Sequence, residues 1–496
     1  MTVINPNSIS GITSITLPSG GDNVLTIHTN DGVERFRIDS SGNVKVGSAA
    51  TISPDGDVFF TGVCTATTLS GAASGLTGAL PAISAANLTN VPAANVVGVH
   101  TSLTVTNATT TGTAVVGGGV TISESGIEAS GIGITCANIN GGQIGNRNLL
   151  INGDMRISQR YGTTSKALTN LKYSLDRWQV VNDAGASKFT TQQVTDAPVG
   201  FYNSLKMTSS SAYTPGTNEV FGVGQKIEGY NTSRLNFGTS NAKTITISFF
   251  VKSSLTGTFS GSVLNEDMTR GFPWTYTINS ADTWERKVVN VTGAPDGTWL
   301  HDHQAGMRVF WSMGTHSTRS DTAGQWSSTQ YQFGATGSTA VVATNGATLQ
   351  ITGCQVEEGL HATDFENRSY SMELELCQRY FTMIDADGSI DNYAPIAVGR
   401  YVNSTTAQFI IHLPTTMRQP PSIEADSTSA ANTFAMNIDG GFNAQQCNNV
   451  SFNERSYNTL TVTTTSSGAT GQTAGTGSTL YSDNTAQALL GISAEY

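Results

Sequence analysis

Seven carboxylates in the middle of the chain are the residues best suited to acid–base chemistry: Glu266, Asp267, Asp302, Glu357, Glu358, Asp364 and Glu366. A glycan-cleaving enzyme needs two carboxyl groups across a cleft, roughly 5 to 10 Å apart. The alternative is that Glu266, Asp267 and Asp302 lie in solvated loops, and that Glu357, Glu358 and Glu366 are surface or hinge residues at the end of a sandwich. We favour this alternative and predict no catalytic residue, because a fold alone never establishes catalysis.

The segment His301-Asp302-His303 has the spacing of a pair of metal ligands. Alternate positions of a strand place two imidazoles on one face, and three chains around an axis would offer six nitrogen ligands to an iron-like metal. No second His-x-His segment extends such a site. We therefore interpret the segment as a loop or exposed strand, and we predict no metal and no cofactor.

Cysteine spacing and nucleotide motifs give no further site. The five cysteines are odd in number, widely spaced and without a Cys-x-x-Cys pair, which argues against a disulfide framework or a zinc site; they are Cys64, Cys136, Cys354, Cys377 and Cys447. We expect mostly buried thiols. Phosphate-binding and nucleophile motifs such as GxxxxGK[ST], GxSxG and HExxH are absent, so nucleotide chemistry is not predicted.

A polar stretch with interspersed aromatic residues near the C-terminus could bind a glycan. Sugar rings stack their apolar faces on aromatic side chains, and their hydroxyl groups need paired donors and acceptors. The alternative is that the aromatic residues fill a small core. The candidate binding residues are Phe442, Asn443, Gln445, Asn449, Arg455 and Tyr457.

The amino-acid composition excludes several classes of protein. Charged residues make up 12% of the 496 residues, about half the usual share of roughly 25% in globular proteins, and 53 glycines are present. The net charge is −11 and Lys and Arg do not cluster, so nucleic-acid binding is not predicted. The first residues lack a basic and an apolar signal region, and no run of about 18 apolar residues occurs. We expect a soluble chain without membrane insertion.

The first third of the chain has the composition of a fibrous segment. Residues 58–123 contain no Asp, Glu, Lys or Arg, yet they also lack the large apolar side chains that fill a core. Such a segment is disordered or wraps with identical chains. Short strands between turns, such as Val33–Ile38, Val44–Val46, Gly112–Gly117 and Gly126–Ile134, favour the second outcome. We predict an N-terminal attachment and hairpin region at 1–50 and a β-structured shaft at 51–146.

Residues 147–368 have the pattern of an antiparallel sandwich. All six tryptophans lie between Trp178 and Trp326, which indicates a conventional core. Alternation over Lys243–Lys252, followed by Gly257–Leu264, predicts two adjacent antiparallel strands. Further strands are expected at 284–291, 306–311 and 347–356, and no βαβ pattern occurs.

One helix and a small domain complete the expected fold. Residues 370–381 are rich in helix formers, with Ser369 as the N-cap, so we predict a connecting helix within 369–382. A strand at 406–414 and another at 489–496 predict a small C-terminal β tip domain at 383–496. The fold class is therefore mostly β.

Two segments resemble a family of bacteriophage tail-fibre proteins that is frequent among phages of cyanobacteria. The first is Arg147-Asn148-Leu149-Leu150-Ile151-Asn152-Gly153-Asp154-Met155-Arg156, with Asp176-Arg177-Trp178. The second is Gly353-Cys354-Gln355-Val356-Glu357-Glu358-Gly359, with Thr363-Asp364-Phe365 and Glu375-Leu376-Cys377-Gln378-Arg379-Tyr380. These signatures resemble those that bracket a jelly-roll, carbohydrate-binding-like fibre domain. The segment 32–44 is similar to the start of many virion fibre proteins.

The resemblance implies an elongated homotrimer in the virion that is made in the host cytoplasm. Its N-terminus would dock on a phage tail, baseplate or adaptor protein, and its distal end would mediate adsorption to host surface glycan or lipopolysaccharide, with the six candidate residues of the tip as receptor-binding residues. Two alternatives remain open. One is a purely structural collar or decoration fibre, and the other is a glycan-degrading depolymerase.

Overall fold

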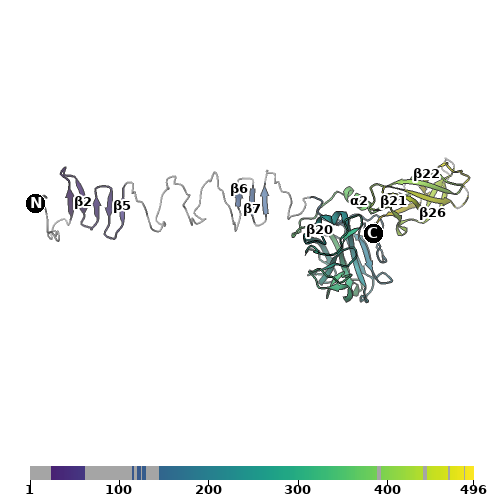
Figure 1. The fold of residues 1–496 in the computed structure, drawn as a ribbon, viewed down its shortest axis with the longest axis horizontal. Helices are drawn as coiled ribbons and strands as arrows, with labels where there is room; N and C mark the ends of the chain where they lie inside the picture. The colour runs from purple at the N-terminus through teal and green to yellow at the C-terminus, as the bar shows by residue number, and fades with distance from the viewer. Residues whose placement is uncertain are drawn as a thin grey trace. The chain divides into compact units, whose positions relative to one another are not determined.

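The computed structural model describes residues 24–61, 114–116, 120–123, 126–129, 145–387, 392–438, 444–466, 468, 470–484 and 486–496. The chain separates into two compact units, Met1–Thr111 and Gly112–Tyr496. Figure 1 shows the order of the elements along the chain. Strands dominate the described residues of both units, and the described helices are few and short, so the prediction of a mostly β protein is confirmed.

The described part of the first unit forms an antiparallel meander with the order β1-β2-β3-β4-β5 (Figure 1). Its strands are β1 (Leu25–His28), β2 (Glu34–Ile38), β3 (Val44–Val46), β4 (Ala50–Ile52) and β5 (Val58–Phe60). The expected strands at 33–38, 44–46 and 58–60 are confirmed. Gly42 has a φ of 84° in the β2–β3 turn, where a glycine has no side chain to strain the backbone.

One face of this meander is entirely apolar. The strand register aligns alternate residues into two rows across the sheet, Ile27, Phe36, Val46, Ala50 and Phe60 in one row and Leu25, Ile38, Val44, Ile52 and Val58 in the other. The opposite face carries the row Thr26, Arg37, Lys45, Thr51 and Phe59. None of the ten apolar side chains is buried within the described part of this unit. We call these ten residues the apolar face.

A second small sheet has the order β6-β7-β8 and consists of β6 (Ala114–Val116), β7 (Val120–Ser123) and β8 (Gly126–Ala129). These strands confirm the expected strand segments in 112–117 and 126–134 as far as the structure describes them. Apart from these strands, residues 51–61 and residues 145–146, the expected shaft lies outside the described residues.

Two five-stranded antiparallel sheets form the sandwich. The first sheet has the order β10-β11-β20-β13-β16, with β10 (Phe189–Val194), β11 (Ser204–Ser209), β13 (Ile245–Ser253), β16 (Glu285–Val291) and β20 (Thr348–Glu358). The second has the order β15-β14-β17-β12-β9, with β9 (Gln179–Asn182), β12 (Val220–Glu228), β14 (Gly257–Leu264), β15 (Gly271–Ile278) and β17 (Ala305–Thr315). Trp178, Trp274 and Trp311 are almost fully buried between the sheets, as the tryptophan distribution predicted.

The prediction that β13 and β14 pair with each other is wrong. β13 pairs with β16 and β20, whereas β14 pairs with β15 and β17 in the other sheet. Both strands bury aromatic side chains, including Phe249 and Phe259, in the common core. A short connection after Ser253 crosses from the first sheet to the second. The apolar side chains of β13 and β14 are then both buried, because the two sheets pack face to face.

Short elements surround the sandwich. They are α1 (Gly229–Thr232), β18 (Ser320–Asp321), β19 (Gly334–Ala335) and the 3-10 turns η4 (Ser233–Leu235), η5 (Ser317–Arg319) and η6 (Val341–Ala343). β18 and β19 form a parallel pair. The segment from η5 to β19 lies over the outer face of the second sheet, where the side chain of Ser262 donates to the carbonyl of Gln332 at 2.7 Å.

The predicted helix is α2 (Tyr370–Gln378). Its N-cap is confirmed, since Ser369 Oγ accepts a hydrogen bond from the backbone N–H of Met372 at 3.3 Å. The helix ends before Phe381, because this residue already begins the next strand. The buried carboxylate of Glu373 accepts the N–H of Asn152 at 2.5 Å and so ties the helix to the start of the sandwich.

The C-terminal part combines a closed barrel with a small sheet. The barrel has the order β22-β23-β27-β26-β25-β28, with β22 (Pro395–Tyr401), β23 (Thr406–His412), β25 (Phe434–Asn437), β26 (Ala444–Arg455), β27 (Thr459–Ser466) and β28 (Gly477–Ser482). The sheet has the order β21-β29-β24, with β21 (Phe381–Asp387), β24 (Ser422–Ile423) and β29 (Gln487–Ser493), and the turns η7 (Ala425–Ser427) and η8 (Ala431–Thr433) lie nearby. The expected strands at 406–414 and 489–496 are confirmed by β23 and β29.

A buried network of charges joins the sandwich to the last residues of the chain. Arg160 forms a two-pronged ion pair with Glu424, at 2.8 and 3.0 Å, and lies 3.5 Å from Glu495. Arg177 pairs with the other oxygen of Glu495. Burial lowers the pKa of Arg177, but Glu495 and the tyrosines Tyr380, Tyr173 and Tyr496 together outweigh burial, so the pKa lies above its ordinary value. These contacts hold the end of β29 against the sandwich.

Candidate functional site

The six candidate receptor-binding residues are spread along one long strand and the turn after it. Phe442 and Asn443 lie outside the described residues. Gln445 lies near the start of β26, Asn449 accepts two hydrogen bonds from Thr465 on β27, and Arg455 donates to the carbonyl of Pro421. Tyr457 follows in the turn and is half exposed. Because a strand rises about 3.3 Å per residue, Gln445 and Arg455 are roughly 30 Å apart and do not meet in one site.

The candidate catalytic carboxylates are mostly engaged in local contacts. Glu357 is buried and accepts hydrogen bonds from Thr363, and Glu366 accepts the backbone N–H groups of Arg147 and Asn148 at 3.1 and 2.9 Å. Glu358 pairs with Lys243 at 2.7 Å. These contacts close the sandwich by joining its first residues to its last strand.

Of the remaining carboxylates, Glu266 and Asp267 follow β14, Asp302 precedes β17, and Asp364 follows β20. Asp302 accepts the N–H of Gln304 in a loop, so His301 and His303 do not occupy a strand. Within the described ranges no three His, Cys, Asp or Glu side chains come together in a way that could hold a metal ion. Glu266 differs from the other candidate carboxylates, because it lies beside two cations, Lys226 and Arg308, at the edge of a groove described below.

The described cysteines are buried free thiols, namely Cys354, Cys377 and Cys447. Burial raises the pKa of Cys447 to about 12, which keeps this thiol protonated at neutral pH. Cys64 and Cys136 lie outside the described residues. None of the described helices is long and apolar enough to span a membrane.

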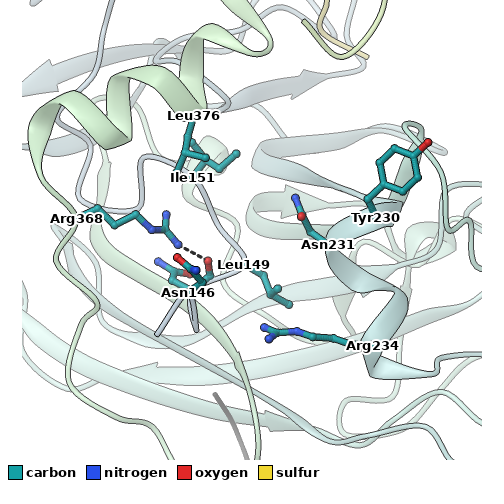
Figure 2. A pocket seen from close by; sticks show the side chains of 9 residues that line it. Asn146, Leu149, Ile151, Tyr230, Asn231, Arg234, Arg368 and Leu376 are labelled. Carbon is teal, nitrogen blue, oxygen red and sulfur yellow. Dashed lines mark hydrogen bonds between the residues drawn. The ribbon is translucent and has the colours of Figure 1, made fainter. Parts of the chain in front are cut away.

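A pocket of about 420 Å³ lies where the chain enters the sandwich, between the first residues of the domain and α1. Figure 2 shows Arg368 and Asn146 on one side and Asn231 and Arg234 on the other, while the ring of Tyr230 extends away from them. Arg368 is engaged by the carbonyls of Asn148 and Leu150. The pocket therefore offers amides and two arginines, and its one aromatic residue, Tyr230, turns its ring away from them.

A groove of about 350 Å³ lies on the outer face of the second sheet, away from the sandwich core. Alternation along the strands decides which side chains reach it. In β17, Val309 and Trp311 pack in the core, whereas Arg308 and Phe310 point to the opposite side. In β12, Val223 packs inward and Lys226 lines the groove.

The floor of the groove is a small hydrophobic cluster of its own. Val220, Leu264 and Phe310 are its buried members, and Val181, Met268 and Phe333 are partly exposed. The rings of Phe310 and Phe333 meet edge to face, with centroids 5.2 Å apart. A side chain at Gly224 would come within 3.2 Å of the Phe310 ring and 2.6 Å of the Val309 carbonyl, so a glycine is needed for the ring to lie over β12.

Two cations face each other at one end of this floor. Lys226 and Arg308 are directly opposite in the register of β12 and β17. Like charges in this arrangement repel. Glu266 lies between them and binds Arg308 with both oxygens, at 3.0 and 2.8 Å, but it is 3.6 Å from the ammonium of Lys226. Burial and the nearby Arg308 lower the pKa of Lys226 to about 8.

The rim carries three bulky residues in the left-handed backbone region. They are Leu171 (φ 64°), Met268 (φ 55°) and Tyr331 (φ 64°). Twelve described residues other than glycine have a positive φ; six are Asn or Asp, and these three are half of the remaining six. Backbone bonds hold them, since Tyr331 donates to the Met268 carbonyl at 2.8 Å and Leu171 to the Val180 carbonyl at 2.9 Å. Strained residues of this kind cluster at binding sites.

The far end of the groove has a second pair of charges. Arg319 lies over the ring of Tyr331, with 4.6 Å to its centroid. Asp183 accepts the N–H of Val220 at 3.0 Å and an amide hydrogen of Asn170 at 2.8 Å, and burial raises its pKa. The groove therefore has three cations, Lys226, Arg308 and Arg319. It has two carboxylates, Glu266 and Asp183.

This combination of features suits a polar ligand with an apolar face. Exposed parts of Tyr331, Phe333 and Leu171 offer hydrophobic surface, and charged side chains around them offer donors and acceptors. A sugar ring has both kinds of surface.

Sequence reasoning identified only Glu266 among the charged groups of the groove, and as a candidate acid. It missed the cations and the aromatic rim, because their positions depend on the pairing of β12 with β17 and on a loop that folds back over the sheet.

No protein-family model matches the chain, and no curated protein matches it. Solved structures do. The enzymatically active domain of tailspike protein 4 from bacteriophage CBA120 is 12% identical, with a TM-score of 0.24, over 42% of this chain and 21% of that chain. A xylan-binding domain from Paenibacillus barcinonensis is 15% identical, with a TM-score of 0.21, over 37% of this chain and 91% of that chain.

A family 11 carbohydrate-binding module from Clostridium thermocellum, solved with a mixed-linked tetrasaccharide, is 14% identical, with a TM-score of 0.22, over 40% of this chain and 99% of that chain. The chain is thus structurally similar to carbohydrate-binding modules and to one phage tailspike domain. At these identities and TM-scores the likenesses identify neither a ligand nor an activity.

Proposed function

We propose that this protein is a subunit of a homotrimeric bacteriophage tail fibre that is part of the virion and attaches to host surface glycan or lipopolysaccharide. The sequence resemblance supplies the virion location, the docking on a tail, baseplate or adaptor protein, and the number of chains. The groove on the sandwich supplies a place where a glycan would bind. No catalytic role is assigned to any residue in this proposal.

The observation that carries the proposal is the apolar face of β1–β5. A single layer with ten apolar side chains on one side cannot form a core in one copy, because a sheet must pack its apolar face against another layer. Apolar surface is stabilised by roughly 25 cal/mol for each Å² removed from water. Identical chains would supply the missing layer, and the polar row with Arg37 and Lys45 would face water.

The mass of the purified full-length protein in solution tests the assembly. Light scattering should give about three times 52.0 kDa. Phe36→Asp places a charge in the middle of the apolar face and should shift the mass toward one chain, whereas Thr51→Asp, on the opposite face of the same sheet, should leave it unchanged. A wild-type mass of a single chain would contradict the proposal.

Adhesion requires a second measurement. The full-length protein should bind immobilised bacterial lipopolysaccharide or capsular polysaccharide from at least one host, with many weak sites acting together on each fibre. An assembled protein that binds no glycan would favour the structural collar or decoration fibre. Release of reducing sugar from a bound polysaccharide would favour the depolymerase.

A further inference from the structure

We propose that the groove on the second sheet binds a carboxylated saccharide, with the sugar carboxylate paired to Lys226 and the sugar ring against Tyr331 and Phe333. This inference rests on the proposed glycan-binding function and specifies the class of sugar. It assigns the binding site to the sandwich, whereas the sequence placed its candidate residues near the C-terminus.

The first argument is the state of Lys226. Its side chain is 11% exposed, yet its one described ion pair, with Glu266, is long at 3.6 Å. Both oxygens of Glu266 are already bound by Arg308. A largely buried ammonium costs free energy unless it is paired and hydrogen-bonded. A ligand carboxylate would complete the pairing that the protein leaves incomplete.

The second argument is the charge of the site. Lys226 and Arg308 carry two positive charges and Glu266 one negative charge, so this end of the groove has an excess of one. Arg177, which bonds to the Lys226 carbonyl, also disfavours the charged form of Lys226, and the ring of Tyr496 lies 5.3 Å from its ammonium. One extra positive charge matches a monoanion. A dianionic phosphate would leave this end of the groove with one excess negative charge, whereas a sugar carboxylate balances the charge.

The third argument is the surface next to Lys226. Phe333 and Tyr331 lie along the same groove as the ammonium. The carbonyl of Met268 accepts the backbone N–H of Tyr331 and so joins the two strained turns of the rim. The strained residues lie where an apolar rim meets a cation whose one described ion pair is long, which is the arrangement needed to bind a sugar ring and its acid group together.

The test uses the full-length protein and two probes with the same sugar rings, titrated by calorimetry: trigalacturonic acid, which carries one carboxylate on each ring, and its methyl ester, in which these groups are neutral. Wild-type protein should bind the acid more tightly than the ester. Lys226→Met removes the charge at similar length and should weaken acid binding by about tenfold or more, which corresponds to one charged hydrogen bond, while leaving ester binding unchanged. Tyr331→Ala should weaken both.

Lys188→Met is the matched control, because Lys188 also lies over a tyrosine ring, at 4.2 Å from the Tyr213 centroid, but does not line the groove. It should bind both probes like wild type. Equal binding of acid and ester, binding of the acid unchanged by Lys226→Met, binding of neither probe, or tighter binding of glucose 6-phosphate than of glucuronic acid would each overturn the inference. Any of these results together with binding to lipopolysaccharide would leave the proposed function standing.

Discussion

Replacing Glu495 by Gln should destabilise the protein strongly, because this carboxylate neutralises two buried arginines. The side chains of Arg160 and Arg177 are 0% and 1% exposed, and that of Glu495 is 5% exposed. Removing one partner of a buried ion pair typically costs about 3 to 5 kcal/mol. The other contacts of Arg160 and Arg177 determine where in this range the loss of stability falls.

The structure favours the lower end of that range. Arg160 keeps both bonds to Glu424. Arg177 keeps its bond to the Lys226 carbonyl, at 2.6 Å, and its position 3.5 Å from the centroid of the Tyr380 ring. A desolvated cation over an aromatic ring contributes about 2 kcal/mol. We therefore expect a loss of about 3 kcal/mol, or roughly 6 to 12 °C in Tm for a domain of this size.

Urea unfolding followed by tryptophan fluorescence measures this loss, because the indole of Trp178 bonds to the Asn152 carbonyl beside the network. Glu454→Gln, an exposed change on β26, is the control and should lie within about 0.5 kcal/mol of wild type. The double variant Arg177→Met with Glu495→Leu removes both charges and should be more stable than Glu495→Gln alone. A Glu495→Gln protein as stable as the Glu454→Gln control would refute the role of the buried network.

Three further predictions concern the groove and α2. Binding of trigalacturonic acid should weaken about tenfold between pH 7 and pH 9, because Lys226 has a pKa of about 8 and only its protonated form pairs with a carboxylate; a flat titration profile would contradict this. Glu266→Gln removes the competing carboxylate and should strengthen binding of the acid but not of its methyl ester, as calorimetry would show. Ser369→Ala should lower the free energy of unfolding by about 1 kcal/mol through loss of the N-cap, with Ser371→Ala as the control.

Local patterns in the sequence determined much of the secondary structure. Alternation predicted β13, because side chains of a strand point to opposite faces with a period of two. Short runs separated by turn residues predicted β14, β16, β17 and β20. Helix-forming residues after Ser369 predicted α2 and its cap. The absence of charge over 58–123 predicted dependence on partner chains, which stays a prediction.

Only the tertiary structure decided which elements meet. β13 and β14 follow each other in sequence but lie in different sheets. Their apolar side chains are buried between the two sheets, so the strands face each other across the core and do not pair by hydrogen bonds. Arg177 and Glu495 are 318 positions apart and pair only because β29 returns to the sandwich. Lys226 and Arg308 face each other through the register of two strands, and no local pattern specifies that register. The binding groove therefore follows from long-range pairing, which the order of residues along the chain does not show.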